Sequence, residues 1–421
     1  MSKPKVIIIG SGFGGLHTCR SLKHADASVT LIDKTNHHLF QPLLYQVASA
    51  ALAPSDVAAP IREVFKGYDN TSVLMNEVEE ILKEKKQVRL ATGELLDFDY
   101  LVIAVGAEQS YFGHDDWKEH TSGIKTLADA LHLRRELLLA YEEAESSEMY
   151  EDTEDSLSFA IVGGGPTGVE MAGAFAEVAH RTLMKNFRKI DPNKTKIYLI
   201  EGHPHLLPPY PKELGERAQK DLEKMGVTVI TGVHVTNITD DGVYIGDRLI
   251  KSQHVIWAAG NKAPALLKTL NVPLDRGGRV IVGKDLSIPD EPNIFVIGDA
   301  ASAQDREGNP LPGIAPVAIQ QGHYVAKLIR SQVAPEKRKP FQYFDKGTMA
   351  AIGKTKAVGM IGKWKLKGFF AWVIWSVVHI FYLVGFRSRA LVMVQWFLWY
   401  VTGSRSSRLI LEGMFEDTKK M

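Results

Sequence analysis

The hydrophobic pattern of the chain repeats one theme twice: a short apolar run, a glycine cluster and then a helical periodicity. The first copy spans 6–24, VIIIGSGFGGLHTCRSLKH, and the second spans 159–181, FAIVGGGPTGVEMAGAFAEVAHR. An uninterrupted apolar run is typical of a parallel strand that helices cover on both faces. The pattern therefore predicts two strand–turn–helix units, each opening a parallel α/β sheet.

Glycines at GxGxxG spacing close each predicted turn. The first glycine permits a tight turn, the second lets the backbone approach a pyrophosphate, and the third lets the helix pack close to the strand. The helix N-terminus then presents unpaired amide groups and a positive dipole end to the phosphates. We therefore expect two dinucleotide sites, formed by Gly10, Gly12 and Gly15 in the first copy and by Gly163, Gly165 and Gly168 in the second.

An acid ends the strand that follows each glycine cluster. Asp33 closes SVTLID, 23 residues after Gly10, and Glu201 closes KIYLIE, 38 residues after Gly163. A carboxylate at this position accepts hydrogen bonds from ribose hydroxyls. Because Glu201 would also repel a 2′-phosphate, it favours NADH over NADPH. The alternative is a glutamate that only caps a loop.

Three later apolar runs end in glycine. LVIAVGA and HVIWAAGN mirror each other and bring the backbone close to a ligand at Gly106 and Gly260. A last strand, NIFVIGDAA, places Gly298 and Asp299 at its end. Open α/β sheets bind ligands at the carboxyl ends of their strands, so Asp299 is expected to accept from polyol hydroxyls, a role compatible with capping a helix.

The segments between these strands carry weaker signals. Residues 72–99 alternate like antiparallel strands around a turn at Thr92-Gly93, and 127–140 and 316–329 are predicted helices. Residues 142–155 hold eight acids and no base, which indicates a solvated linker. In the turn-rich stretch after Asp33, Gln41, Pro42 and Tyr45 either wall a flat cofactor or form ordinary loop and core.

At 421 residues the chain should hold two or three domains. The expected fold class is α/β, with two Rossmann-like dinucleotide-binding domains and a C-terminal helical region that associates with membranes. The predicted boundaries are 1–120 and 266–345 for the two parts of the first dinucleotide-binding domain, 121–265 for the second, which contains the acidic linker, and 346–421 for the C-terminal region.

Charge and cysteine content exclude several classes of protein. The net charge is +1 and no nucleic-acid signature appears, so nucleic acid is not an expected partner. The single cysteine, Cys19, rules out an intrachain disulfide, a redox-active cysteine pair and a cysteine-ligated cluster; it is expected to be a small buried residue. His37 and His38 lack carboxylate or cysteine partners at ligand spacing, so no metal site is predicted. The apolar pattern begins directly with the first strand, so no signal peptide is expected.

The C-terminal region is basic and apolar. Between 346 and 411 there are ten Lys/Arg and no Asp/Glu, which leaves the rest of the chain near −9. Two uncharged runs, 369–386 and 390–403, lie between basic clusters, and five of seven tryptophans fall between Trp364 and Trp399. A helical hairpin lying in the membrane interface would place every basic cluster at the headgroups. The alternative is a pair of core or dimer-interface helices.

These motifs resemble one family over nearly the whole chain. Two GxGxxG sites with a late GD strand are similar to the two-dinucleotide flavoproteins. Within them, LFQPLLYQVA, GGGPTGVEMAGAFAE, FVIGDAA, PVAIQQG and DKGTMAAIG before a Trp-rich basic tail resemble the type II, non-pumping NADH:quinone oxidoreductases. The resemblance implies FAD as cofactor, NADH as electron donor and a membrane quinone as acceptor.

The resemblance also implies roles for individual residues. Glu170 is expected near the nicotinamide and Lys346 near the flavin, as catalytic groups; a plain first-turn acid is the alternative for Glu170. Quinone is expected against the helix that carries Ala315, Gln320 and Gln321. Many members have Ala-Gln at its start, whereas this chain has Ala315-Pro316, so Gln320 is the better candidate. The implied FAD contacts are Gly10, Gly12, Gly14, Gly15, Asp33, Lys34, Gln41, Pro42, Gly106, Gly298, Asp299 and Ala318, and the implied NADH contacts are Gly163, Gly165, Gly168, Glu201 and Gly260.

The absence of a cysteine pair or metal site also bears on the reaction. NADH supplies a hydride, and the chain has no cysteine pair or predicted metal site to carry the electrons onward from the flavin. The acceptor must therefore reach the flavin itself. A membrane-embedding tail at 363–408 selects a lipophilic acceptor, and the expected location is the cytoplasmic face of the cell membrane or the inner face of an organelle membrane. A redox sensor or interaction protein with slow turnover remains the alternative function, and a homodimer remains an open assembly.

Overall fold

A computed structural model describes residues 3–147, 157–403, 405 and 407–410. The chain divides into two compact units, each assembled from three stretches of sequence. Unit 1 comprises Met1–Leu39, Ala59–Glu108 and Asn261–Lys346; unit 2 comprises Phe40–Ala58, Gln109–Gly260 and Gly347–Met421. Each unit contains one of the two glycine clusters, and each is described below by itself.

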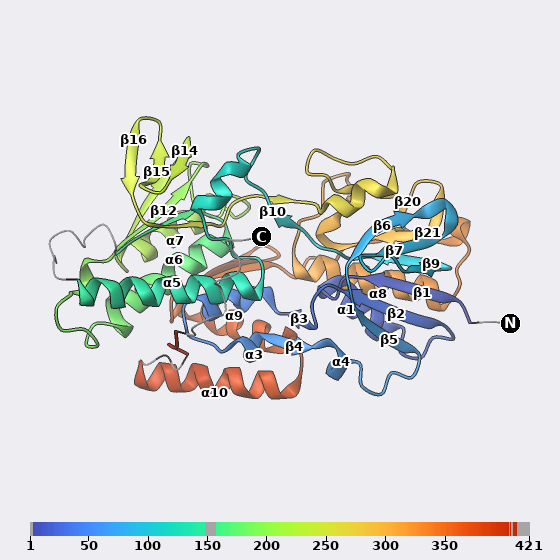
Figure 1. Cartoon of the computed structure of the whole chain (residues 1–421), viewed down its shortest axis with the longest axis horizontal. Coiled ribbons are helices and arrows are strands. Elements are labelled where there is room, and N and C mark those ends of the chain that lie inside the picture. Colours follow the sequence, from blue (N-terminus) through green and yellow to red (C-terminus); the bar gives the residue numbers. More distant parts are fainter. Residues whose placement is uncertain (1–2, 148–156, 404, 406, 411–421) are drawn as a thin grey trace. The chain divides into compact units, whose positions relative to one another are not determined.

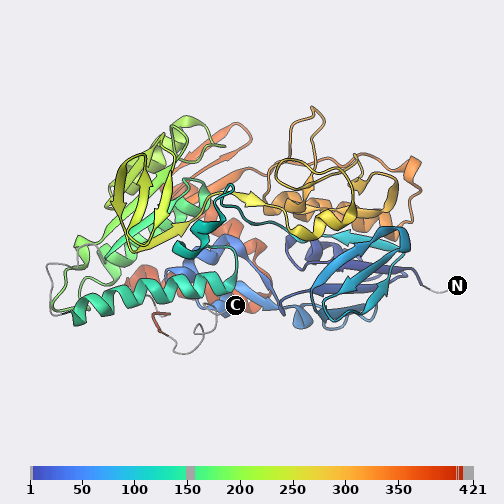
Figure 2. The same cartoon turned by 45° about the horizontal axis from the view of Figure 1, so that its top comes forward.

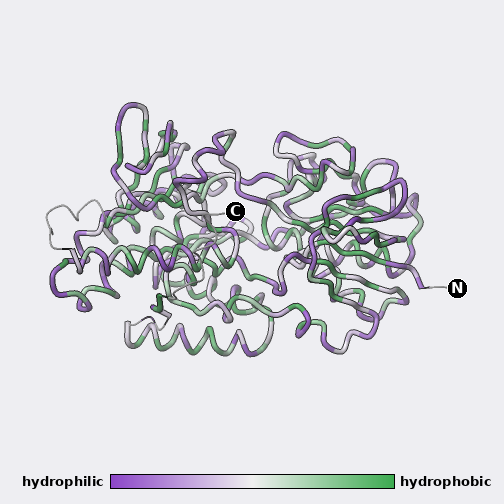
Figure 3. The backbone as a smooth tube through the Cα atoms, viewed as in Figure 1, coloured by the Kyte–Doolittle hydropathy of each residue, from purple (hydrophilic) through white to green (hydrophobic). Residues whose placement is uncertain are grey.

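A six-stranded sheet forms the centre of unit 1, with the strand order β20-β21-β9-β1-β2-β5. All neighbours are parallel except β20 and β21. Ile8 lies opposite Leu31 on one side and Val102 on the other, and all three are fully buried, as the uninterrupted apolar run predicts. Figure 3 colours the backbone by hydropathy and shows hydrophobic, green segments within both units. The strands are β1 (Lys5–Ile9), β2 (Ser28–Asp33), β5 (Thr71–Met75), β9 (Tyr100–Ile103), β20 (Ser287–Ile288) and β21 (Glu291–Val296).

Two helices of unit 1, α1 (Phe13–Ser21) and α8 (Ala315–Arg330), pack against each other. A separate small sheet (Figure 2) consists of three antiparallel strands, Val78–Leu82, Gln87–Leu90 and Leu95–Asp97. The turn between the last two strands, at Thr92-Gly93, confirms the predicted antiparallel turn. The antiparallel prediction was wrong for β5, which pairs in parallel with β2 as an edge strand of the main sheet. The remaining elements are β3 (His37–Leu39), β4 (Ala58–Pro60), α4 (Ile61–Val64), β6 (Val78–Leu82), β7 (Gln87–Leu90), β8 (Leu95–Asp97), β10 (Glu108–Gln109), β18 (Asn261–Lys262), β19 (Val280–Ile281) and β22 (Ala301–Ser302).

Unit 2 is built on a parallel four-stranded sheet with the order β13-β12-β11-β17. Figure 1 labels β12 of this sheet and the helices α5, α6 and α7 of the same unit. Its central strand, β11, is buried along its whole length, and α6 follows the second glycine cluster. The elements up to residue 260 are α2 (Leu44–Ala48), α3 (Pro54–Val57), α5 (Leu127–Ser146), β11 (Ser158–Val162), α6 (Pro166–Glu177), β12 (Lys196–Glu201), α7 (Lys212–Glu223), β13 (Val227–Thr231), β14 (Asn237–Thr239), β15 (Gly242–Ile245), β16 (Arg248–Lys251) and β17 (His254–Trp257).

Helix α5 runs six residues beyond its predicted end. We expected the helix to stop at 140 and the acidic linker to start at 142, but Glu142 to Ser146 are helical. Every fourth or third residue of α5 is apolar and buried as far as Ala144, so packing continues the helix through the first acids. The rest of the predicted linker, 148–156, lies outside the described residues.

The C-terminal part of unit 2 consists of three antiparallel strands followed by two helices. These are β23 (Thr348–Ile352), β24 (Lys356–Ile361), β25 (Trp364–Lys367), α9 (Gly368–Tyr382) and α10 (Phe386–Thr402). Two helices were predicted in the apolar runs 369–386 and 390–403, but α9 ends four residues early and α10 starts four residues early. Leu383, the C-cap of α9, is extended, and Gly385, the N-cap of α10, has φ +90, so the chain turns within the first run.

Candidate functional site

The first glycine loop has the geometry that its spacing predicts. Gly10 has φ +95, and a Cβ there would lie 2.4 Å from the carbonyl oxygen of Ala104. A Cβ on Gly15 would lie 1.8 Å from the carbonyl oxygen of Gly10, so only glycine lets α1 start this close to β1. Gly12, by contrast, faces open space. Backbone atoms therefore pack against Gly10 and Gly15, whereas the space beside Gly12, at the N-terminus of α1, is free for a phosphate. We call this arrangement a phosphate cradle.

Asp33 at the end of β2 is held by four donors. Its Oδ2 accepts from the backbone N and Oγ of Ser11 at 2.6 and 2.7 Å, and its Oδ1 accepts from the backbone N and Oγ1 of Thr35, both at 2.7 Å. These bonds fix the carboxylate beside the glycine loop. Because each carboxylate oxygen can accept more than one bond, the fixed group can still accept from a ribose hydroxyl.

Other predicted FAD residues of unit 1 also lie at the carboxyl ends of its parallel strands. Gly106 follows β9 with φ +70, and Gly298 follows β21 with φ +70. A Cβ on Gly14 would lie 3.0 Å from Ile297 and 3.6 Å from the carbonyl oxygen of Ala318, so these residues form one packed corner. Asp299 lies beside Gly313, whose Cβ would be 3.1 Å from Oδ1. The residues present fit a bound dinucleotide.

Three further predicted FAD contacts are Lys34, Gln41 and Pro42. Lys34 is exposed after β2. Gln41 and Pro42 belong to unit 2, where the Gln41 amide donates to the Lys125 carbonyl at 3.0 Å and Pro42 lies in a short 3₁₀ turn. Their contact with FAD remains a prediction.

The second glycine loop repeats the first in unit 2. Gly163 has φ +113, a Cβ on Gly168 would lie 1.8 Å from the carbonyl oxygen of Gly163, and Gly165 faces open space. Glu201 at the end of β12 accepts from the backbone N of Gly164 at 2.6 Å. The residues that we predicted for NADH therefore form a second cradle of the same design.

Two further residues complete this corner of unit 2. His203 donates its backbone N–H to Glu201 Oε1 at 2.8 Å, and His203 Nδ1 lies 2.7 Å from the same oxygen. Gly260 follows β17 with φ +72, and a Cβ there would meet the carbonyl oxygen of Ser110 at 2.7 Å. A side chain at 260 is therefore excluded by both backbone conformation and space.

Glu170 lies on α6 and is buried. It accepts a hydrogen bond from the backbone N–H of Ala351 at 3.1 Å. Burial raises the pKa of this carboxyl to about 8, although the Ala351 amide and the Trp375 side chain favour its charged form. Glu170 therefore carries a proton at neutral pH, unlike an ordinary exposed first-turn acid.

The predicted quinone contacts lie on α8 in unit 1. Ala315 begins the helix. The amide of Gln320 is engaged at both ends by the backbone of Phe344, with Nε2 donating to its carbonyl and Oε1 accepting from its N–H, each at 2.9 Å. Gln321 is buried, and its Oε1 accepts from the backbone N–H of Gly298 at 2.6 Å. Lys346 lies at the last position of unit 1.

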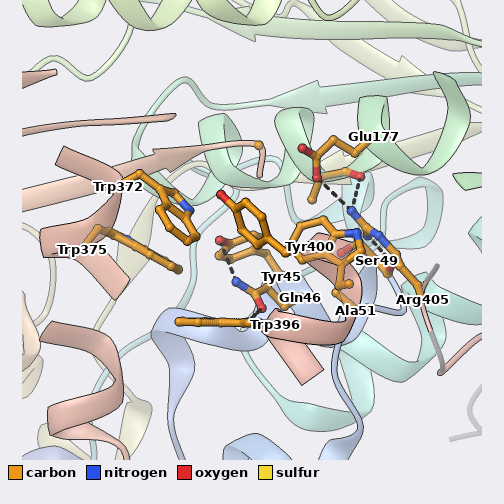
Figure 4. A pocket seen from close by; sticks show the side chains of 13 residues that line it. Tyr45, Gln46, Ser49, Ala51, Glu177, Trp372, Trp375, Trp396, Tyr400 and Arg405 are labelled. Atoms are coloured by element: carbon orange, nitrogen blue, oxygen red, sulfur yellow. Dashed lines mark hydrogen bonds and ion pairs between the residues drawn. The ribbon is translucent and has the colours of Figure 1, made fainter. Parts of the chain in front are cut away.

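A buried polar set in unit 2 was missed by sequence reasoning. Glu177 and Arg405 form an ion pair at 3.1 Å with side-chain exposures of 5% and 1%, and the Arg405 guanidinium also donates to Ser49 and Ala174 carbonyls. Figure 4 shows this pair at one side of an aromatic pocket and Gln46 bonded to Trp396 at another. Burial raises the pKa of Glu177 and lowers that of Arg405.

Arg405 therefore corrects one prediction. We counted it among the basic residues at lipid headgroups, but it points inward and closes a pocket whose other walls come from α2, α6, α9 and α10. The signal was available in the sequence, because Glu177 lies two helical turns after Glu170 in a helix that is otherwise apolar. Two acids on one face of such a helix require buried partners.

The outward faces of α9 and α10 are apolar. Phe370 and Phe386 are 79% and 86% exposed, and Trp364 before α9 is 78% exposed. Lys363, Lys365, Lys367 and Arg387 are exposed beside them. The other exposed large apolar residues of the two helices are Phe369, Val373, Val377, Val378, Phe381, Leu391, Met393, Val394, Phe397, Leu398 and Val401.

Among the described residues, no helix combines the length and the apolar character needed to cross a bilayer. Cys19 is fully buried on α1, and burial raises the pKa of its thiol to about 12. The prediction of a buried, unreactive cysteine is therefore confirmed.

Comparison with known proteins gives consistent relatives. A family model described as pyridine nucleotide-disulphide oxidoreductase matches residues 4–322. The type II NADH:quinone oxidoreductase Ndh of Mycobacterium tuberculosis is 42% identical over 97% of this chain and 90% of its own length. The type II NADH:quinone oxidoreductase of Staphylococcus aureus is 32% identical over 85% of this chain and 90% of its own length.

Solved structures share the fold. NDH2 of Plasmodium falciparum, determined in complex with NADH, matches with a TM-score of 0.87 at 22% identity, covering 97% of this chain and all of that one. The sulfide:quinone oxidoreductase of Aquifex aeolicus matches with a TM-score of 0.74 at 19% identity, covering 92% of each chain. The predicted α/β fold is confirmed by these matches.

Proposed function

Because the chain belongs to the pyridine nucleotide-disulphide oxidoreductase family and, within it, to the type II NADH:quinone oxidoreductases, we propose that it oxidises NADH through bound FAD and reduces a membrane quinone without pumping protons. The observation that carries the proposal is the duplicated cradle: two glycine loops of one geometry, each with a fixed acid at the next strand end.

The first cradle is the proposed FAD site. Gly12 faces open space for the pyrophosphate, the N-terminus of α1 supplies the positive dipole end, and Asp33 accepts from the ribose. Gly298, held by Gln321, brings its backbone to the same corner. Bound there, FAD would supply the capacity to take a hydride and return two electrons. Other flavin contacts that we propose are Gly106, Asp299, Ala318, Lys34, Gln41 and Pro42.

The second cradle is the proposed NADH site. The N-terminus of α6 would bind the pyrophosphate, and Glu201 would accept from the ribose hydroxyls and repel a 2′-phosphate. We assign NADH to this loop and FAD to the first because α6 carries Glu170 one turn after its start. A proton carrier is expected on the nicotinamide side of the reaction.

Quinone reduction consumes two protons, whereas NADH brings one with its hydride, so one more must come from the protein or solvent. Glu170 is protonated at neutral pH and can provide it. Lys346 is the proposed charge balance for a reduced flavin. Ala315 and Gln320 on α8 remain the proposed quinone contacts, whereas Gln321 supports Gly298.

The exposed apolar faces of α9 and α10, with lysines and arginines beside them, support attachment to a membrane surface. The surface that we propose is the cytoplasmic face of the cell membrane or the inner face of an organelle membrane. Substituting Phe370 and Phe386 by serine should lower the fraction of protein bound to anionic vesicles. Substitution tests this more cleanly than truncation, because α10 also carries the buried Trp396 and leads to Arg405.

A two-step mixing experiment tests the central proposal. Purified protein should be yellow and release FAD on acid denaturation, NADH should bleach it, and a short-chain quinone should restore the colour at the rate of turnover. Bleaching without recovery would instead support a sensor with slow turnover. Reconstituted vesicles should show no acidification of their lumen during turnover; acidification would contradict the absence of pumping.

A further inference from the structure

Different residues hold the two strand-end acids, Asp33 in the first cradle and Glu201 in the second. Two positions after Asp33, Thr35 contacts Oδ1 through its backbone N and its hydroxyl, both at 2.7 Å. Two positions after Glu201, His203 makes the same pair of contacts with Oε1, at 2.8 Å through its backbone N and 2.7 Å through Nδ1. An imidazole thus occupies the place of an uncharged hydroxyl.

The two partners at this corner face solvent to different degrees. The side chain of Glu201 is 9% exposed, whereas that of His203 is 66% exposed. The ring therefore covers the carboxylate on one side and presents its other edge outward. At Gly165, which follows the glycine bonded to Glu201, a Cβ would meet no atom within 4 Å.

Few other titratable groups lie in the segments that are hydrogen-bonded to Glu201 and His203. Three segments meet at this corner: 163–168, joined through the Gly164 N–H to Glu201; 201–211; and 231–236, joined through the Gly232 N–H to the His203 carbonyl at 2.8 Å. Their remaining titratable side chains are His205, bonded to the Leu206 carbonyl; His234, packed on Gly202; and the buried Tyr210. Glu201 is the one carboxylate in these segments.

We propose that His203 makes the choice of nucleotide donor depend on pH, an inference that rests on the proposed binding of the dinucleotide at the second glycine loop. Neutral His203 leaves the Glu201 charge to repel a 2′-phosphate. Protonated His203 forms an ion pair with Glu201 and offers its outer N–H to the phosphate, which admits NADPH. Histidine is the side chain that ordinarily changes charge between pH 5 and 8.

The test compares the ratio of kcat/KM for NADPH to that for NADH at pH 8 and pH 6. In the wild type this ratio should rise about tenfold on acidification, the effect of one charge-assisted hydrogen bond. The His203→Thr variant copies the first cradle: it keeps a donor to Glu201 and removes the charge. The 2′-phosphate also titrates in this range, but it does so equally in both proteins, so the difference between them isolates His203.

His234→Thr is the matched control, because His234 packs on Gly202 and makes no bond to Glu201. It should keep the wild-type rise, while His203→Thr should lose at least two thirds of it. Calorimetric binding of adenosine 2′,5′-bisphosphate and of ADP to the oxidised holoenzyme should show the same shift without turnover.

An equal rise in the wild type and His203→Thr would overturn the proposal and assign the pH dependence to Glu201 or the phosphate. Loss of the rise in His234→Thr would also overturn it. Failure of the wild type to oxidise NADH at pH 8 is a different result, which would contradict the proposed function itself.

Discussion

The two glycine loops have the same backbone and different chemistry. In both, the third glycine touches the carbonyl oxygen of the first, and the strand-end acid receives the N–H that follows the first glycine. Two residues after the third glycine, however, α1 carries His17 and α6 carries Glu170. Burial lowers the pKa of His17 to about 3 and raises that of Glu170 to about 8.

Both side chains are therefore neutral at pH 7. Glu170 is neutral because its carboxyl keeps a proton that it can release, whereas His17 is neutral because its imidazole has given one up. Glycine spacing therefore sets the shape of the loop proposed to bind a phosphate. The packing of the helix that follows the loop decides whether a side chain there holds a proton that it can release. α1 packs on α8, while α6 packs on α2 and β23, whose Ala351 amide contacts Glu170.

The largest effect is expected from filling one loop at a time. Gly15→Ala should yield protein without flavin, because its Cβ would overlap a backbone oxygen that cannot move aside. Gly168→Ala should keep flavin and weaken NADH binding about hundredfold or more. Flavin absorbance per chain and NADH titration measure the two effects.

Gly12→Ala is the control for folding, since no atom lies within 4 Å of its Cβ. It should fold normally and weaken FAD binding alone. Loss of flavin from both Gly15→Ala and Gly168→Ala would show that the loops do not serve separate nucleotides.

The next effect concerns a feature that α6 has and α1 lacks, the buried Glu177–Arg405 pair. Arg405→Met should destabilise unit 2 by about 3–5 kcal/mol, because Glu177 is left buried without its partner. Urea unfolding measures the loss. The double variant Glu177→Leu with Arg405→Met should recover much of it, and Arg408→Met, at a partly exposed arginine, should cost little. Equal losses in all three would contradict the pairing.

A smaller effect is expected on the reaction itself. Glu170→Gln should slow quinone-dependent reoxidation of the flavin about hundredfold at pH 7, since the side chain no longer releases a proton. Bleaching by NADH should change little. In the wild type, reoxidation should fall as pH rises through about 8, and this decline should vanish in the variant. A wild-type rate for reoxidation in Glu170→Gln would exclude Glu170 as the donor.

The smallest effects are opposite slopes of stability with pH. The raised pKa of Glu170 means that the native state keeps a proton that the unfolded chain loses, so stability should fall between pH 4.5 and 8. The lowered pKa of His17 means that the unfolded chain gains a proton first, so stability should fall as pH drops from 6.5 towards 3. Glu170→Gln should flatten the first slope and His17→Asn the second, each by a few degrees in melting temperature; a slope unchanged by its variant would contradict the assignment.

The sequence predicted the cradles because glycine spacing has a local meaning. Gly10, Gly15, Gly163 and Gly168 are constrained by contacts within a dozen residues or by the adjacent strand, and those constraints show in the spacing itself. The strand ends at Asp33 and Glu201 follow from the apolar runs before them. Local rules therefore suffice for the loops and for the order of strand and helix.

Other features depend on residues far apart in the chain. In the sequence Arg405 is one more basic residue of the tail, because its partner, Glu177, lies 228 residues earlier. The raised pKa of Glu170 depends on its burial where α6 packs on β23, a strand far along the chain, and the role of Gln321 depends on Gly298. The break between α9 and α10 was missed for a different reason: residues 383–385 lie inside an uncharged run, where hydropathy does not mark the break.

The buried state of Cys19 has a practical consequence. With its sulfur enclosed and its thiolate strongly disfavoured, the native protein offers thiol-directed reagents no target among the described residues. A cysteine introduced at any exposed position can therefore carry a spin label or a fluorophore without a competing background. One such label in each unit would turn their separation in solution, with and without nucleotide, into a measured distance.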